Sequence, residues 1–255
     1  MRYVLLIVLL WAGAAQAEGR RLLSRTEAAD WRAVGRLNID GRGFCTATLI
    51  APDLVLTAAH CVFSDRTRLP VRPNALHFVA GYYIGDYIAH RRVRRVMVHR
   101  GYDPLRELSE RQITSDIAVL ELVTPINEVH PFERELRPRA GDPIVVVSYA
   151  ADRPEAPSIQ EPCDTIAVED RFVVMDCDVT FGASGSPVFT VRNGRPRISS
   201  VVSAIGMRGG DQQVAYGAAI DEGALDSVLT DIVHGDADRG IRRPGSSIAQ
   251  QLGRE

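Results

Sequence analysis

Three residues that lie far apart along the chain have the types needed for nucleophilic catalysis. His60 lies in Thr-Ala-Ala-His-Cys at residues 57–61, Asp116 opens Asp-Ile-Ala-Val-Leu at residues 116–120, and Ser184 lies in Gly-Ala-Ser-Gly-Ser-Pro at residues 182–187. A serine hydroxyl is a weak nucleophile at neutral pH and needs a histidine to accept its proton, and that histidine needs a carboxylate to fix its tautomer. The sequence therefore predicts Ser184 as nucleophile, His60 as general base and Asp116 as the orienting acid.

Glycines surround the proposed nucleophile. Gly182 and Gly185 tolerate positive φ and close backbone approach, which a tight turn around Ser184 requires. Such a turn would point the N–H groups of Gly182 and Ser184 into one concavity, which predicts an oxyanion hole. Taken alone, the segment also fits a solvent-exposed Gly/Ser turn.

Asp116 stands before the wholly apolar residues 117–120. An unpaired carboxylate at the entrance to a buried strand would be costly, so we expect Asp116 to have a partner. Asp116 also fits a surface aspartate at the start of a strand. His60 also fits a core histidine that packs beside a disulfide.

Short apolar runs separated by turn residues must position these side chains. They predict strands at residues 33–39, 45–50, 54–57, 77–80, 93–98, 117–122, 144–148, 164–168, 172–176, 187–191, 198–204 and 214–220. Many short strands with regular turn signals are typical of an all-β sandwich or barrel. After Asp221, apolar residues recur at helical spacing and predict a helix near the end of the chain.

Composition limits the classes of partner. The chain has 255 residues, of which 45% are hydrophobic and 24% charged, which suits one large domain or two small ones. A net charge of -2 gives no reason to expect nucleic acid or an anionic membrane as partner. Close Cys and His spacings of the kind that bind metal are lacking in the sequence, so we expect no metal site.

The N-terminus has the pattern of a targeting segment. A short cationic start, an apolar run over residues 4–10 and the small-x-small residues 15–17 predict a signal peptide at residues 1–17. A membrane anchor would need about 20 apolar residues. We therefore expect a secreted or periplasmic protein, with residues 18–30 as an N-terminal arm or propeptide and residues 235–255 as a flexible tail.

The His60, Asp116 and Ser184 segments together resemble the signatures of the chymotrypsin-like (trypsin-fold) serine proteases. The Ser-Gly-Ser-Pro ending is similar to the bacterial branch that includes the glutamyl endopeptidases, and the resemblance covers about residues 31 to 233. It implies two six-stranded antiparallel β-barrels, at residues 31–135 and 136–234, the second ending in a C-terminal helix. It also implies a serine endopeptidase that acts on protein or peptide substrates through an acyl-enzyme, with no cofactor, and we expect a monomer.

The four cysteines allow three pairings, and an exported protein favours bridges over free thiols. Pairing of sequence neighbours gives Cys45–Cys61 and Cys163–Cys177. The first matches the family disulfide that ties the histidine loop to the preceding strand.

The resemblance leaves substrate preference open. Asp178 lies six residues before Ser184, where trypsin-like members place the acid that binds Arg or Lys, but it also fits a residue that makes only loop hydrogen bonds. Ser203 resembles part of the substrate-binding strand, whose backbone pairs with an extended peptide. Arg208 lies nearby and argues the opposite way, for an acidic substrate side chain.

One departure from the family concerns activation. Ala183 stands where trypsin-like zymogens carry the aspartate that binds a new N-terminus, so we do not expect activation by that ion pair. Two other functions remain as alternatives: a catalytically silent protease fold used as a binding module, and an esterase. An α/β-hydrolase esterase would carry Gly-x-Ser-x-Gly and place its histidine last, whereas here the histidine comes first.

Overall fold

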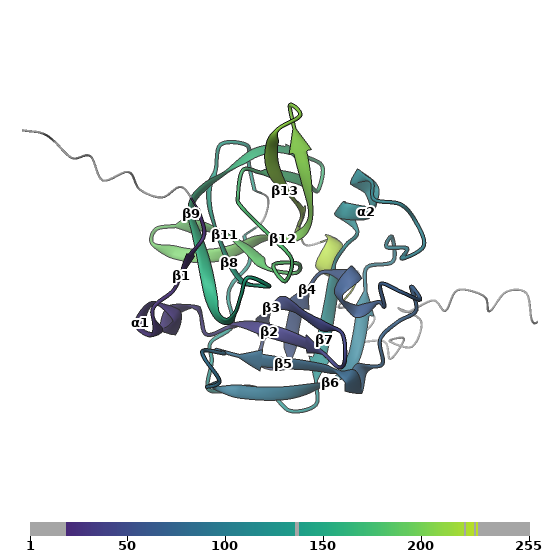
Figure 1. Cartoon of the computed structure of the whole chain (residues 1–255), viewed down its shortest axis with the longest axis vertical. Coiled ribbons are helices and arrows are strands. Elements are labelled where there is room, and N and C mark those ends of the chain that lie inside the picture. Colours follow the sequence, from purple (N-terminus) through teal and green to yellow (C-terminus); the bar gives the residue numbers. More distant parts are fainter. Residues whose placement is uncertain (1–18, 136–137, 222, 227, 229–255) are drawn as a thin grey trace, which may run out of the picture.

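The structure, a computed structural model, describes residues 19–135, 138–221, 223–226 and 228 (Figure 1). The predicted signal peptide and the predicted C-terminal tail lie outside the described residues. Within the described part, strands dominate and the helices are short.

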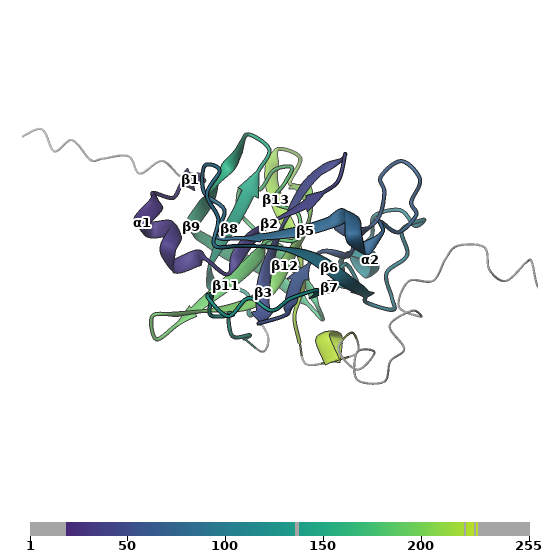
Figure 2. The same cartoon turned by 90° about the horizontal axis from the view of Figure 1, so that it is seen from below.

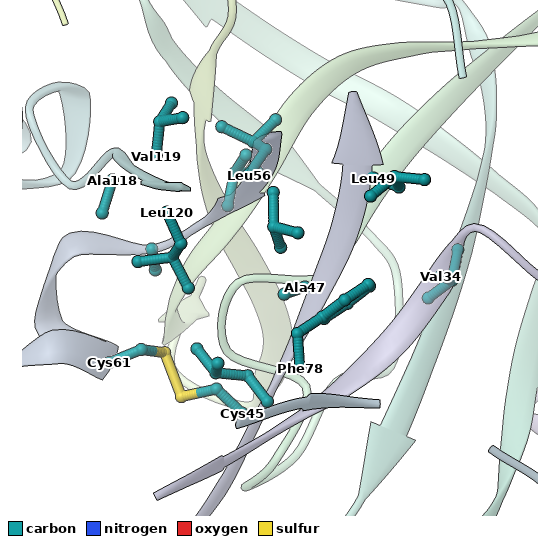
Figure 3. Packing of buried hydrophobic residues seen from close by; sticks show 14 of the residues in the cluster. Val34, Cys45, Ala47, Leu49, Leu56, Cys61, Phe78, Ala118, Val119 and Leu120 are labelled. Atoms are coloured by element: carbon teal, nitrogen blue, oxygen red, sulfur yellow. A yellow bond between two sulfur atoms is a disulfide. The ribbon is translucent and has the colours of Figure 1, made fainter. Parts of the chain in front are cut away.

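Six strands close the first barrel: β2 (Val34–Ile39), β3 (Gly43–Ala51), β4 (Leu54–Thr57), β5 (Leu76–Ala80), β6 (Ala89–Val98) and β7 (Ala118–Leu122). They follow the order β2-β3-β4-β7-β6-β5, and antiparallel pairing of β2 with β5 closes the ring. Leu49, Leu56, Phe78 and Leu120 are fully buried in its interior (Figure 3). This packing fixes the end of β4, after which His60 follows, and the start of β7, which Asp116 precedes.

The second barrel contains β8 (Pro143–Ala150), β9 (Arg153–Glu169), β10 (Phe172–Met175), β11 (Pro187–Arg192), β12 (Arg195–Arg208) and β13 (Gln212–Ala219). Their order is β9-β10-β13-β12-β11-β8, and the additional pairing of β8 with β9 completes a ring of six. The two barrels lie side by side, the first in purple and blue and the second mainly in teal and green (Figures 1 and 2). The predicted all-β fold with two six-stranded antiparallel barrels is confirmed.

β9 is much longer than the strand expected at residues 164–168. Its first part contains Pro154, Pro157 and Pro162, which lower the strand propensity of the segment because proline cannot donate to a ladder. The carbonyls still accept hydrogen bonds, as Pro157 does from the backbone N–H of Leu23. Pairing with β8 and β1 therefore extends the strand beyond what its residue types predict.

The N-terminal arm folds onto the second barrel. β1 (Arg21–Leu22) pairs with β9, and α1 (Arg25–Ala28) and the 3₁₀ turn Ala29–Trp31 follow it (Figure 1). Leu23 is buried, and the ring of Trp31 lies 5.0 Å from that of Phe189 on β11. The arm is thus part of the packed structure from β1 onward.

Two further short elements lead to the predicted catalytic residues. The 3₁₀ turn Ala59–Val62 carries His60, and α2 (Glu110–Thr114), which the sequence did not predict, precedes Asp116. α2 begins after Ser109, whose side chain accepts from the backbone N–H of Gln112. α1 and α2 lie at opposite ends of the molecule (Figures 1 and 2).

The predicted C-terminal helix is described only in its first turns. Residues 223–226 and 228 are helical, and Asp221 caps them by accepting from the backbone N–H of Ala224 at 2.6 Å, as expected. The rest of that helix lies outside the described residues. In the part of the chain that the structure describes, no helix has the length and apolar character needed to cross a membrane.

Candidate active site

His60 and Asp116 form a tightly bonded pair. His60 Nδ1 lies 2.7 Å from Asp116 Oδ2, and the backbone N–H of His60 donates to Asp116 Oδ1 at 2.8 Å. Because an ionised carboxylate can only accept a hydrogen bond, Nδ1 carries the proton of the neutral ring and donates it to Asp116. Nε2 is then left as the acceptor. This is the tautomer that a general base requires.

Asp116 is buried, and its charge is satisfied from both barrels. Ser203 on β12 of the second barrel donates its hydroxyl to Asp116 Oδ2 at 2.5 Å, while both His60 donors belong to the first barrel. Three donors offset the desolvation of a buried carboxylate. The expectation that Asp116 has a partner therefore agrees with the structure.

The pair also sets the basicity of His60. Burial alone would lower the pKa of His60, but charge attraction and hydrogen bonding from Asp116 outweigh it and raise the pKa above its usual value. Stabilising the protonated ring lowers the free-energy cost of accepting a proton from a nucleophile.

A disulfide fixes the segment that carries His60. Cys61 is bonded to Cys45 on β3 in the core of the first barrel (Figure 3), and Cys163 is bonded to Cys177 in the second barrel. Both predicted pairings are confirmed. The clusters that bring Cys61 near His60 and Cys177 near Asp176 offer no thiolate to a metal ion, because their sulfurs are joined as disulfides.

The loop that carries Ser184 packs directly against the segment leading to His60. Gly185 adopts φ +78°, and a Cβ there would overlap Thr57 Oγ1 and would stand 3.0 Å from the backbone nitrogen of Ala58. Only a glycine therefore lets the loop come this close to the His60 segment. No hydrogen bond joins Ser184 to His60 within the described residues, and such catalytic contacts often tighten only when substrate binds.

Thr46 on β3 ties the same loop to the first barrel. Its backbone N–H donates to the carbonyl of Ser184 at 2.9 Å, and its hydroxyl donates to the carbonyl of Gly182 at 2.9 Å. The hydroxyl also accepts from the backbone N–H of Tyr149 on β8. Sequence reasoning missed this residue, since a threonine within a strand carries no sign of its distant partners.

The turn around Ser184 presents two backbone donors without an internal acceptor. Ala183, Gly185 and Ser186 all donate their N–H groups to backbone carbonyls nearby. Among the described residues, the N–H groups of Gly182 and Ser184 find no acceptor in the protein. Gly182 adopts φ +90°, which suits the turn expected for an oxyanion hole.

The backbone of Ser203 is not paired with the neighbouring strand β13, although Ser203 lies on β12. Val202 pairs with Gly217 and Ala204 with Tyr216, so the register shifts at Ser203 and leaves it outside the β12–β13 ladder. A strand position that is not paired within its own sheet suits the predicted backbone pairing with an extended peptide. The contact of its hydroxyl with Asp116 was not predicted.

Asp178 does not lie as a buried acid facing an empty pocket. Its side chain is 49% exposed and accepts from Arg20 Nε at 3.2 Å, and its backbone N–H donates to Gln160. These contacts favour the interpretation that Asp178 makes only loop hydrogen bonds, over the interpretation that it is a buried acid that binds Arg or Lys.

Arg208 lines a cavity of about 440 Å³ between the segment that contains α2 and the second barrel.

Comparison with known proteins decides the family. The sequence model of the family described as Trypsin matches residues 23–222. The chain belongs to the trypsin family. Its described fold agrees with a solved Glu endopeptidase in complex with MPD, with a TM-score of 0.71 and 20% identity, over 85% of this chain and 97% of that one.

Curated relatives of this trypsin-family chain match over shorter stretches. A trypsin of Sarcophaga bullata is 29% identical over 111 residues, 42% of this chain and 39% of that protein. A modular serine protease of Drosophila melanogaster is 33% identical over 92 residues, 34% of this chain and 14% of that protein. The matches thus span less than half of either relative.

Proposed function

We propose that this protein is a serine endopeptidase with His60, Asp116 and Ser184 as its catalytic triad. The observation that carries the proposal is the His60–Asp116 pair, held by two hydrogen bonds, with the Ser184 loop packed against the segment that leads to His60. Membership of the trypsin family supports hydrolysis of peptide bonds in protein or peptide substrates.

In the proposed reaction, Ser184 Oγ attacks the scissile carbonyl and His60 Nε2 takes the hydroxyl proton. Asp116 keeps the other ring proton on Nδ1 and stabilises the imidazolium. The free N–H groups of Gly182 and Ser184 donate to the oxyanion of the tetrahedral intermediate. His60 then protonates the leaving amine, and water hydrolyses the acyl-enzyme with His60 again as base.

We also propose that the enzyme acts in a secreted or periplasmic location. Two disulfides support this, because such bonds persist in oxidising compartments and are rare in the cytosol.

Covalent labelling tests the proposal. A fluorophosphonate should add once to the wild-type protein and not at all to Ser184→Ala, as read by intact mass. Ser184→Ala should also lower kcat for peptide hydrolysis by at least about 10³-fold. Ser186→Ala, two residues along the same loop, is the matched control and should still be labelled. A folded, disulfide-bonded wild type that takes no label would contradict the proposal and favour a binding module.

A further inference from the structure

Arg20 on the N-terminal arm is nearly buried although its guanidinium is charged. Its side chain is 9% exposed, and its Nε lies 3.2 Å from Asp178 Oδ2. Its Nη1 and Nη2 face the two carboxylate oxygens of Asp152 at 3.3 and 3.4 Å. The planar fork of an arginine thus bridges two acids from separate segments of the chain.

Both acids belong to segments that hold the loop of the proposed oxyanion hole. Asp178 stands four residues before Gly182. Asp152 follows Ala151, whose backbone N–H donates to the carbonyl of Phe181 at 2.7 Å, directly before Gly182. Arg20 therefore connects Asp178, at the start of the loop, to the turn at residues 151–152, which contacts the loop at Phe181.

The arm itself is anchored to the strand beside this loop. Arg21 pairs with Ile159 on β9, and the next residue of that strand, Gln160, accepts from the backbone N–H of Asp178 at 3.0 Å. Arg153, at the start of β9, donates to the carbonyl of Arg20 at 2.6 Å. The arm, β9 and the loop thus form one continuous network.

Charge attraction supports this bridge. Asp152 and Asp178 carry like charges, and Arg20 contacts both acids, whereas Arg153 Nε lies 3.6 Å from Asp152. Burial alone would raise the pKa of Asp152, but the hydrogen bond and charge of Arg20 outweigh it and lower the pKa. The contact thus favours the ionised acid.

We propose that Arg20 is a positioning residue that holds the loop from Asp178 to Ser184 in the arrangement the oxyanion requires. The inference rests on the proposed function for its catalytic consequence. It assigns the N-terminal arm to the working enzyme: a mature chain that has lost Arg20 would have a loosened loop. The arm then acts as a built-in part of the site and not as a removable propeptide.

Amide hydrogen exchange tests the positioning independently of catalysis. Arg20→Met keeps the apolar stem and removes the charge, and should speed exchange at residues 178–186 by about tenfold while leaving the first barrel unchanged. Arg21→Met is the matched control, because Arg21 lies on the same arm but is 49% exposed and binds Glu27 and Glu161 instead of Asp152 and Asp178. Equal exchange in Arg20→Met and wild type would overturn the proposal.

A second variant keeps the test decisive if Arg20→Met does not fold. Asp178→Asn leaves Arg20 bound to Asp152 and should speed exchange of the same loop. Unchanged exchange in a folded Asp178→Asn protein would also overturn the proposal.

Kinetics test the catalytic consequence. Arg20→Met should lower both kcat and the rate of fluorophosphonate labelling by about tenfold, because both need the oxyanion donors. KM should change less than about threefold, and Arg20→Lys should recover part of kcat. A wild type that takes no label contradicts the proposed function alone, whereas equal kcat in wild type and folded Arg20→Met contradicts the role of Arg20.

Discussion

The protonation state of His60 governs the proposed chemistry at the scale of single residues. Nε2 accepts the proton of Ser184 only while the ring is neutral, so activity should rise as pH rises through the pKa of His60. Asp116 raises that pKa above its usual value. The kcat/KM of the wild type should therefore rise with an apparent pKa above about 6.5.

Asp116→Asn tests this electrostatic role. The substitution removes the charge that favours protonated His60 and disturbs its tautomer, so the apparent pKa should fall and kcat should drop by up to about 10⁴-fold. Asp65→Asn is the control, because exposed Asp65 attracts His60 only through space. It should lower the apparent pKa slightly and leave kcat nearly unchanged. A pH profile of Asp116→Asn with the wild-type midpoint would refute the assignment.

Single residues differ in how far the sequence could predict their roles, according to whether local neighbours or distant contacts define them. His60, Asp116 and Ser184 each stand in a short segment whose neighbours indicate the local structure. The contact of Ser203 with Asp116 joins residues 87 positions apart, and that of Arg20 with Asp178 joins residues 158 apart. Such contacts depend on how the barrels and the arm pack, and no local pattern encodes them.

At the scale of elements, two glycines distinguish backbone strain from close packing. Gly185 in the Ser184 loop has φ +78°, and Gly194 in the β11–β12 turn has φ +73°. A Cβ at Gly194 would meet open space, whereas one at Gly185 would overlap Thr57 Oγ1 and the carbonyl of Thr46. Gly194 therefore needs only the conformational freedom of glycine, whereas Gly185 also needs the space that a missing Cβ leaves.

Alanine substitutions should separate these costs. Gly194→Ala should lower the free energy of unfolding by about 1–2 kcal/mol, the cost of a left-handed alanine, with activity unchanged. Gly185→Ala should cost more than this and should abolish labelling of Ser184, because the loop must move away from the His60 segment. Urea unfolding and fluorophosphonate labelling measure the two effects. Equal losses of stability, with labelling retained in both variants, would contradict this account of the loop.

Element boundaries were predictable where residue types agreed with the fold. The strands that flank His60 and Asp116 are apolar and bounded by turns, and they appear close to their predicted positions. The first half of β9 was missed because its prolines disfavour a strand, and α2 was missed because its five residues are too few for a helical pattern. Tertiary pairing outweighs local propensity in the first case.

At the scale of the whole molecule, the proposed site lies where the two barrels meet. The first barrel supplies His60 and Asp116, and the second supplies Ser184 and Ser203. The spacing of short strands predicted an all-β sandwich or barrel, and the family resemblance implied two barrels. Neither could predict how the barrels are joined, since that depends on buried polar contacts such as those of Thr46.

Thr46→Val tests whether this junction holds the catalytic groups in place. Valine keeps the shape of threonine but leaves the N–H of Tyr149 without its acceptor and the carbonyl of Gly182 without this donor. We expect a loss of about 1–3 kcal/mol in the free energy of unfolding and a lower kcat, because the Ser184 loop loses one of its ties to the first barrel.

Thr48→Val is the matched control for that junction. Thr48 lies two residues along β3, is equally buried, and donates its hydroxyl to the carbonyl of Ala33 at 3.3 Å and not to the Ser184 loop. Its loss should lower stability by no more than about 1.5 kcal/mol and leave kcat unchanged. If Thr46→Val and Thr48→Val reduce kcat equally, β3 supports the site only through general stability. If only Thr46→Val reduces kcat, the hydroxyl of Thr46 transmits the alignment of the first barrel to the proposed nucleophile.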